Sequence, residues 1–174
     1  MADSSDNWST AARITTGHFD RFHVAILRYL CQFCPEQAEA EDLMQETFLR
    51  LFLEIRNHHE PPNVKAWLFR TGHNLAVDRS RRLGGPKRLV PIADFDGDIR
   101  DPGSSAEQQI IERERVQRVR QAMAWLSPQQ RQCLELRAEG LRYREISQIL
   151  GIQISSVKTF IVRAVARIAG RSDA

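Results

Sequence analysis

Apolar residues recur at helical spacing along most of the chain, and no stretch alternates with the period of two that a half-buried strand requires. The first apolar stripe covers residues 19–33 and ends before Pro35, which cannot continue a helix. Further stripes cover residues 39–56, 64–78 and 107–126. This pattern predicts an all-α protein.

The carboxyl-terminal part carries the clearest local signals. Residues 127–130 (SPQQ) form a capping box with proline at the first helical position, so a helix is expected to begin there. Gly140 and Gly151 suit the left-handed ends of this helix and the next, and Ser155 or Ser156 is expected to cap the last helix. A helix, a short turn containing glycine and a second helix form the helix-turn-helix pattern.

The face of the last predicted helix that packing does not use is polar and basic. It carries Ser156, Lys158, Thr159, Arg163 and Arg167. Small hydroxyls and cations at the start of the second helix suit contacts with phosphates and base edges in a major groove. The alternative is a three-helix bundle whose basic face is only solvated.

Charge is segregated along the 174 residues, although the net charge is only +3. Acidic side chains crowd residues 36–60 and 94–114, and basic side chains crowd residues 65–88 and 142–171. The two basic blocks suit a polyanionic partner. With 42% hydrophobic and 27% charged residues, the composition excludes a disordered chain.

The helical periodicity is lost over residues 84–106, which are rich in glycine, proline and aspartate. We interpret this segment as a flexible acidic linker between two small helical domains, residues 18–83 and residues 107–170. The polar residues 1–17 are expected to form a mobile extension. The aspartates of the linker do not have the spacing of a calcium-binding loop.

No apolar run approaches the ~20 residues that a membrane-spanning helix needs, and the polar start lacks the apolar core of a signal peptide. The sequence therefore predicts a cytoplasmic protein without direct membrane insertion. Three cysteines, an odd number, argue against a disulfide framework.

Cys31 and Cys34 form a CxxC pair, and His58, His59 and His73 follow it. A structural zinc site or a redox dithiol is the functional interpretation of this pair. A second CxxC or a spaced HxxxH is missing, and both cysteines lie in or beside an apolar stripe, where a free thiol packs well. We therefore expect core packing, with no metal and no cofactor.

Two predicted helices of the first domain carry charged and apolar side chains that packing alone does not require. Residues 39–56 combine a wide apolar surface with an acidic flank, so this helix either docks a partner protein or is buried between two neighbours. Residues 64–82 interleave aromatic rings with arginines and end in a basic run, as suits a single-stranded nucleic acid. Trp67 is expected in the core, and Phe69 has no assignment.

Three blocks of the sequence resemble one family. Residues 40–52 (AEDLMQETFLRLF) closely resemble the core-binding helix of bacterial extracytoplasmic-function (ECF) sigma factors. Residues 66–70 (AWLFR), with Asn74 and residues 78–82 (DRSRR), resemble their promoter-melting helix. Their second DNA-binding domain is resembled by residues 126–131, 143–146 and 156–158.

The resemblance implies a non-enzymatic subunit that binds core RNA polymerase, recognises and melts promoter DNA, and starts transcription. Core polymerase would be held by Asp42, Gln45, Glu46, Phe48, Leu49 and Phe52. The opened minus-ten element would contact Lys65, Arg70, Asn74, Asp78, Arg79, Arg81 and Arg82. The minus-thirty-five duplex would contact Arg144, Ser155, Ser156, Lys158, Thr159 and Arg163. The resemblance also implies control by an anti-sigma factor, which is membrane-anchored in one subgroup of the family.

The last helix departs from the family pattern at Gln153, where many members have a capping serine, and at Phe160 and Val165, where they carry arginine. Arg142 stands where a small capping hydroxyl is usual. Residues 155–158 (SSVK) most resemble the iron-uptake subgroup, whose members are controlled by a membrane anti-sigma regulator.

Two other functions share parts of this pattern. A stand-alone transcriptional repressor or activator needs the second domain but not the acidic helix, so tight binding of duplex DNA without polymerase would favour it. A metal- or thiol-dependent sensor or nuclease would use Cys31, Cys34 and the histidines, so stoichiometric zinc would favour it.

Overall fold

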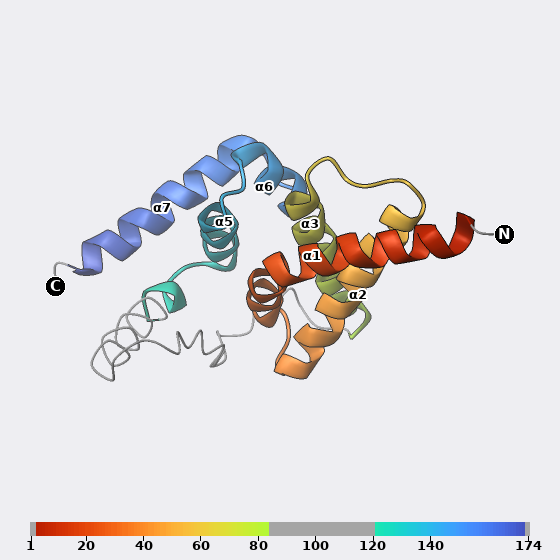
Figure 1. Cartoon of the computed structure of the whole chain (residues 1–174). Helices are drawn as coiled ribbons and strands as arrows, with labels where there is room; N and C mark the ends of the chain where they lie inside the picture. The colour runs from red at the N-terminus through yellow and green to blue at the C-terminus, as the bar shows by residue number, and fades with distance from the viewer. Residues whose placement is uncertain (1–2, 84–120, 173–174) are drawn as a thin grey trace, which may run out of the picture.

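The computed structural model describes residues 3–83 and 121–172, and in this part of the chain it contains helices and no strand. The amino-terminal unit consists of α1 (Asp3–Cys31), α2 (Gln37–Arg56) and α3 (Val64–Arg82), and the carboxyl-terminal unit contains α5 (Pro128–Ala138), α6 (Tyr143–Leu150) and α7 (Ile154–Ser172) (Figure 1). The all-α prediction is therefore confirmed. The predicted linker, residues 84–106, lies outside the described residues, as does most of the helix predicted over residues 107–126.

Helix α1 is longer than the sequence pattern predicts. We expected residues 1–17 to form a mobile extension, but the structure describes residues 3–17 as the first part of α1. The Asn7 side-chain amide donates a hydrogen bond of 2.8 Å to the Arg56 carbonyl, and the Trp8 ring meets the Phe52 ring edge-on, with 4.8 Å between centroids. Contacts to α2, together with Ala11, which is buried in the apolar core, hold this segment.

Aromatic residues of α1 and α3 meet in the core of the amino-terminal unit. Phe69 is only 1% exposed and lies edge-on to Tyr29, with 5.4 Å between ring centroids. The Tyr29 hydroxyl is hydrogen-bonded to Nδ1 of His73 at 2.9 Å, so this buried polar pair is satisfied. Trp67, which we expected in the core, is only partly buried, so Phe69 is the core aromatic of α3.

The local signals of the carboxyl-terminal unit produce the predicted helix starts and ends, with one exception. Ser127 Oγ accepts a hydrogen bond from the Gln130 backbone at 3.3 Å, and the Ser127 backbone N–H donates to the Gln130 side chain at 3.0 Å, so the capping box is confirmed. Gly140 and Gly151 adopt φ values of +84° and +66°, which terminate α5 and α6. Helices α6 and α7 are bent by 103° at their turn, as in a helix-turn-helix.

The exception is the start of α7. This helix begins at Ile154, so Gln153 occupies the position before it, and Ser155 and Ser156 lie inside the helix. The Val157 backbone N–H donates to the Gln153 carbonyl at 3.1 Å. The prediction that Ser155 or Ser156 caps the helix is therefore wrong.

The two units pack against each other along α3 and α6 (Figure 1). Leu136 and Ile146 of the carboxyl-terminal unit belong to the same cluster of buried apolar residues as Leu30 and Phe69 of the amino-terminal unit. We call this contact the seam. It brings α5 close to α1 and α3, although residues 83–127 lie between α3 and α5 in the sequence.

Candidate functional site

Helix α2 presents an acidic stripe that ends in a leucine. Asp42, Gln45 and Leu49 are exposed, and Leu49 is 53% accessible. Glu46, partly exposed on the same stripe, accepts a hydrogen bond from Arg50 Nε at 2.8 Å. Positions 42, 45, 46 and 49 follow the i, i+3, i+4, i+7 spacing of one helical face. Such a face suits a protein surface that is both basic and apolar.

Two of the residues predicted to hold polymerase are less exposed than Asp42, Gln45 and Leu49. Phe48 is 5% exposed and packs edge-on against the Phe19 ring at 5.0 Å, so it belongs to the core. Phe52 is partly covered by Trp8, a residue that is 54% exposed and has the Arg56 guanidinium 5.8 Å from its ring centroid. Sequence reasoning missed Trp8 as part of this surface, although an isolated tryptophan in a polar stretch was the available signal.

Helix α3 has a separate polar face. Arg70, Asn74, Asp78 and Arg81 are exposed and follow each other at one-turn intervals, and Arg82 is exposed beside them. Arg81 Nη1 lies 3.6 Å from Asp78 Oδ1, one turn earlier, which leaves the other two side chains of the row accessible to a ligand. Arginines spaced in this way along a helix can each neutralise a phosphate.

The remaining two cations predicted on α3 already have carboxylate partners. Arg79 Nη2 lies 3.4 Å from Glu39 Oε1 at the start of α2. Lys65 Nζ lies 3.1 Å from Glu139 Oε2 and also donates a hydrogen bond to the Glu139 backbone carbonyl. A nucleic acid would have to compete with these two glutamates.

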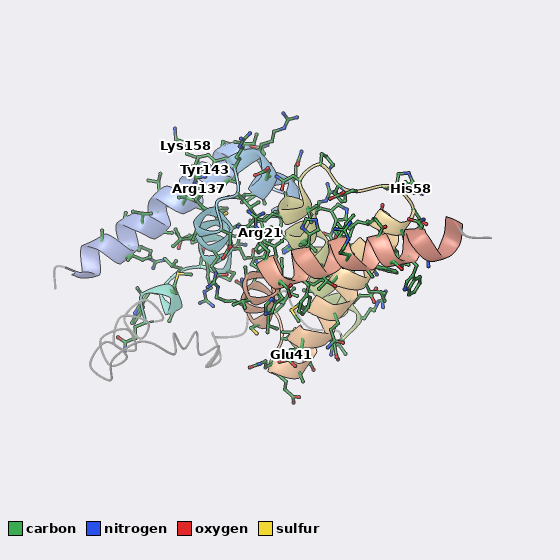
Figure 2. All side chains as sticks on the ribbon, viewed as in Figure 1. Arg21, Glu41, His58, Arg137, Tyr143 and Lys158 are labelled. Carbon is green, nitrogen blue, oxygen red and sulfur yellow. The ribbon has the colours of Figure 1, made fainter. Side chains whose placement is uncertain are left out.

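The helix-turn-helix unit exposes nearly all of the residues predicted to contact duplex DNA. Arg144, Ser155, Lys158, Thr159 and Arg163 are exposed, and Ser156 is partly buried. The Lys158 side chain projects outward from α7 (Figure 2). Ser155, Lys158 and Thr159 lie on the first turns of α7, the second helix of the motif, as a major-groove reader requires, with Arg163 further along α7 and Arg144 on α6.

Arg142 precedes α6 and has no side-chain acceptor for a cap, but its backbone takes part in the hydrogen bonds that begin this helix. Its backbone N–H donates to Glu145 Oε2 at 2.6 Å, and its carbonyl accepts from the Ile146 N–H at 3.0 Å. The arginine side chain is exposed and takes no part in the cap. A departure from the family pattern at this position therefore leaves the helix start intact.

The cysteines behave as core residues. Cys34 and Cys133 are buried, Cys31 is partly buried, and burial raises the pKa of each thiol to about 11. A thiol with so high a pKa is a poor nucleophile and a poor metal ligand at neutral pH. Within residues 3–83 and 121–172, no three His, Cys, Asp or Glu side chains are arranged to hold a metal ion.

Among the described helices, none is by itself long and apolar enough to cross a membrane. Only α6 and α7 taken together reach the required length and composition, and the 103° bend separates them.

Two protein-family descriptions match this chain in the order of its two helical units. Sigma-70 region 2 matches residues 18–85, and Sigma-70, region 4 matches residues 116–168. The first match contains the α2 stripe and the α3 face, and the second contains the helix-turn-helix.

The curated relatives are RNA polymerase sigma factors. ECF RNA polymerase sigma factor SigE of Mycolicibacterium smegmatis is 33% identical over 149 residues, which are 84% of this chain and 55% of the relative. ECF RNA polymerase sigma factor SigM of Bacillus subtilis is 28% identical over 150 residues, which are 82% of this chain and 85% of the relative. The match thus spans little more than half the length of SigE but most of SigM.

Two solved structures share the fold. CnrH, solved with the cytosolic domain of CnrY, has a TM-score of 0.60 at 21% identity, covering 98% of this chain and 94% of CnrH. RpoE from Bartonella quintana, solved with the anti-sigma factor NepR, has a TM-score of 0.57 at 23% identity, covering 88% and 92%. Region 2 and region 4 in this order, with ECF sigma factors as relatives over most of the sequence, show that the chain belongs to the extracytoplasmic-function family of RNA polymerase sigma factors.

Proposed function

We propose that this chain is a promoter-specificity subunit that binds core RNA polymerase through α2, holds opened minus-ten DNA with α3 and reads the minus-thirty-five duplex with α7. It acts in the cytoplasm by binding, without catalysis. One observation carries the proposal: an acidic and apolar face, a row of arginines and a helix-turn-helix occupy separate helices of a single chain. The names of its relatives support it.

The α2 stripe is tested by reversing its charge. A double variant, Asp42→Arg with Glu46→Arg, should lose association with core polymerase and promoter-directed transcription while keeping its helical content. Asp20→Arg changes an exposed carboxylate on α1 and serves as the control. Normal association of the double variant with core polymerase would refute the role of this face.

The α7 face is tested in the complex with polymerase. Lys158→Ala and Arg163→Ala should weaken binding of minus-thirty-five duplex and reduce the slope of log K against log salt by about 1 for each lost phosphate contact. Arg13→Ala, on exposed α1, should leave both unchanged. Should the variants lose polymerase binding as well, these two side chains have a structural role instead.

The α3 face is tested by following DNA opening. Capture of unstacked bases has to offset a few kcal/mol of unstacking per step, so loss of cations that hold the strand should reduce melting. Arg70→Ala with Arg81→Ala should therefore lower permanganate reactivity of minus-ten thymines in the polymerase complex, with duplex binding retained. Unchanged reactivity would remove α3 from the melting step.

Control by an anti-sigma factor is the regulatory part of the proposal. CnrH and RpoE were solved with CnrY and with the anti-sigma factor NepR, and this chain exposes the apolar residues Leu49, Leu53, Val162 and Val165 on faces that such a partner would cover. From the resemblance of residues 155–158, we propose that the chain belongs to the iron-uptake subgroup and that its partner is membrane-anchored. Co-expression of a membrane protein encoded beside it should block association with core polymerase, and iron starvation should relieve the block. Transcription that ignores both would refute this control.

A further inference from the structure

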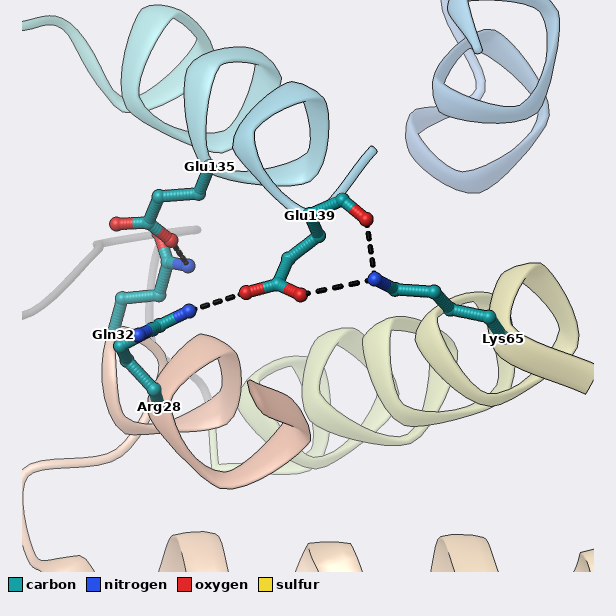
Figure 3. Close-up of polar contacts among 5 residues, drawn as sticks. All are labelled: Arg28, Gln32, Lys65, Glu135 and Glu139. Atoms are coloured by element: carbon teal, nitrogen blue, oxygen red, sulfur yellow. Dashed lines mark hydrogen bonds and ion pairs between the residues drawn. The ribbon is translucent and has the colours of Figure 1, made fainter. Parts of the chain in front are cut away.

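One carboxylate joins the two units at the seam. Glu139, at the end of α5, forms an ion pair with Arg28 of α1 through one oxygen and with Lys65 of α3 through the other, the latter at 3.1 Å (Figure 3). The Glu139 carbonyl also accepts a hydrogen bond from Lys65. Glu139 is mostly buried, with 16% of its side chain accessible. A single side chain thus holds two helices of the other unit.

Further polar contacts flank this bridge. Gln32 Nε2 donates to Glu135 Oε2 at 2.5 Å, one turn before Glu139 on α5 (Figure 3). On the other side, Asn63 Nδ2 donates to Glu145 Oε1 at 2.6 Å, which ties the start of α3 to α6. Together with the shared apolar cluster, these contacts define one docked arrangement of the two units.

This arrangement is incompatible with the proposed reading of a promoter. The minus-ten and minus-thirty-five elements lie roughly 25 base pairs apart, or about 85 Å at 3.4 Å per base pair. Units that touch through hydrogen bonds cannot contact both elements at once. In addition, Lys65 cannot pair with a DNA phosphate while Glu139 holds its ammonium group.

We propose that the free chain masks itself: region 4 docks on region 2, and Glu139 is the latch that occupies Lys65 and Arg28 until promoter-bound polymerase separates the units. This inference rests on the proposed function for its purpose, but the latch itself is a property of the free chain. An anionic side chain here takes the place of a phosphate.

The ion pairs of the latch can be broken. Side chains of Arg28 and Lys65 are 52% and 29% accessible, and ion pairs this exposed are individually weak and screened by salt. An open cleft of about 570 Å³, lined in part by Phe22, Lys65 and Glu139, lies beside the bridge, so solvent ions reach it. Competing charges can therefore displace Glu139 from Arg28 and Lys65, and release of region 4 then also requires the apolar contact of the seam to separate.

Small-angle X-ray scattering of the purified full chain tests the latch directly. Glu139→Lys places a third cation between Arg28 and Lys65, and the radius of gyration should rise by about a quarter above the ~16 Å expected for a compact chain of this length. Asp20→Lys makes the same charge change on an exposed part of α1 and should keep the wild-type radius. Circular dichroism checks that the helices remain.

Glu139→Gln provides a milder variant if Glu139→Lys fails to fold. It keeps the backbone hydrogen bond to Lys65 and removes only the charge, so a smaller expansion is expected. An unchanged radius in a folded variant at position 139 overturns the latch. Binding of a single strand with the minus-ten sequence, which Lys65 is proposed to contact, should also rise several-fold more for Glu139→Lys than for Asp20→Lys, and an equal rise in both overturns the masking.

The same proteins separate this inference from the proposed function. Core polymerase with the wild-type chain is assayed for transcription from a promoter library. A chain that expands on mutation of Glu139 but never directs transcription would refute the proposed function and support the latch. A chain that directs transcription but has the same radius in all variants would refute the latch alone.

Discussion

Glu135 makes the stability of this chain depend on pH in a direction opposite to that of a surface carboxylate in an ion pair. Burial at the seam raises the pKa of its carboxyl from 4.5 to about 7, and Glu139 adds to the rise. The hydrogen bond from Gln32 and the charges of Arg131 and Arg28 lower the pKa but do not outweigh burial. The folded chain therefore holds a proton that the unfolded chain loses above pH 4.5.

The sign and size follow from proton linkage. Because the folded pKa is the higher one, the contribution to stability is fully present below pH 4.5 and is lost as the pH rises through about 7. At about 1.4 kcal/mol per tenfold change in proton affinity, the whole effect is roughly 3 kcal/mol, of which about 2.5 kcal/mol is lost between pH 5 and pH 8. Gln32 Oε1 is buried without a hydrogen-bond partner. A protonated Glu135 carboxyl also supplies a hydrogen-bond donor in the surroundings of this amide oxygen.

Glu135→Gln is the informative perturbation, because glutamine imitates the protonated carboxyl and does not titrate. Urea unfolding at several pH values between 5 and 8 should show the free energy of unfolding of the wild type falling by about 2.5 kcal/mol relative to the variant. Glu36→Gln, at an exposed position before α2, serves as the control and should follow the wild type. Parallel profiles for the wild type and Glu135→Gln would refute the assignment of a buried, proton-binding glutamate at the seam.

Three further substitutions test local features of the fold. Ser127→Ala removes the acceptor of the α5 capping box and should lower the free energy of urea unfolding by about 1 kcal/mol. Gly151→Ala forces an L-residue to adopt φ +66° and should cost about 1–2 kcal/mol in the same assay. Trp8→Ala removes the edge contact with Phe52, worth about 0.5–1.5 kcal/mol beyond its buried area, and should accelerate hydrogen exchange in the first turns of α1 without unfolding α2.

Most helix limits that depend on neighbouring residues were predictable from the sequence, with the start of α7 as the exception. The Ser127 capping box and the left-handed Gly140 and Gly151 act within a few residues, so their effect does not depend on the rest of the fold. The start of α1 is different, since the hydrogen bond from Asn7 to the Arg56 carbonyl spans 49 residues. Periodicity cannot reveal a helix whose support comes from another element.

Helical spacing also predicted which charged side chains are exposed, but not which of them have partners. Arg70 and Arg79 look equivalent as basic residues of one helix, yet only Arg79 lies 3.4 Å from Glu39. Phe48 and Leu49 are neighbours in the predicted docking stripe, but a rotation of 100° puts one in the core and the other in solvent. The face of α2 is therefore narrower than its sequence indicated.

The contacts of Glu139 illustrate why the seam could not be found in advance. Its partners lie 74 and 111 residues away, and an isolated glutamate near a turn has no pattern. The underlying electrostatics is nevertheless general, because a surface cationic enough to hold nucleic acid also attracts the acidic residues of its own chain. Salt weakens both interactions alike. The proposed exchange of Glu139 for DNA at Lys65 would therefore conserve the local charge balance, and geometry would set its equilibrium. A strand presented in register by polymerase would gain contacts along the whole of α3, whereas Glu139 reaches Lys65 of α3 and Arg28 of α1.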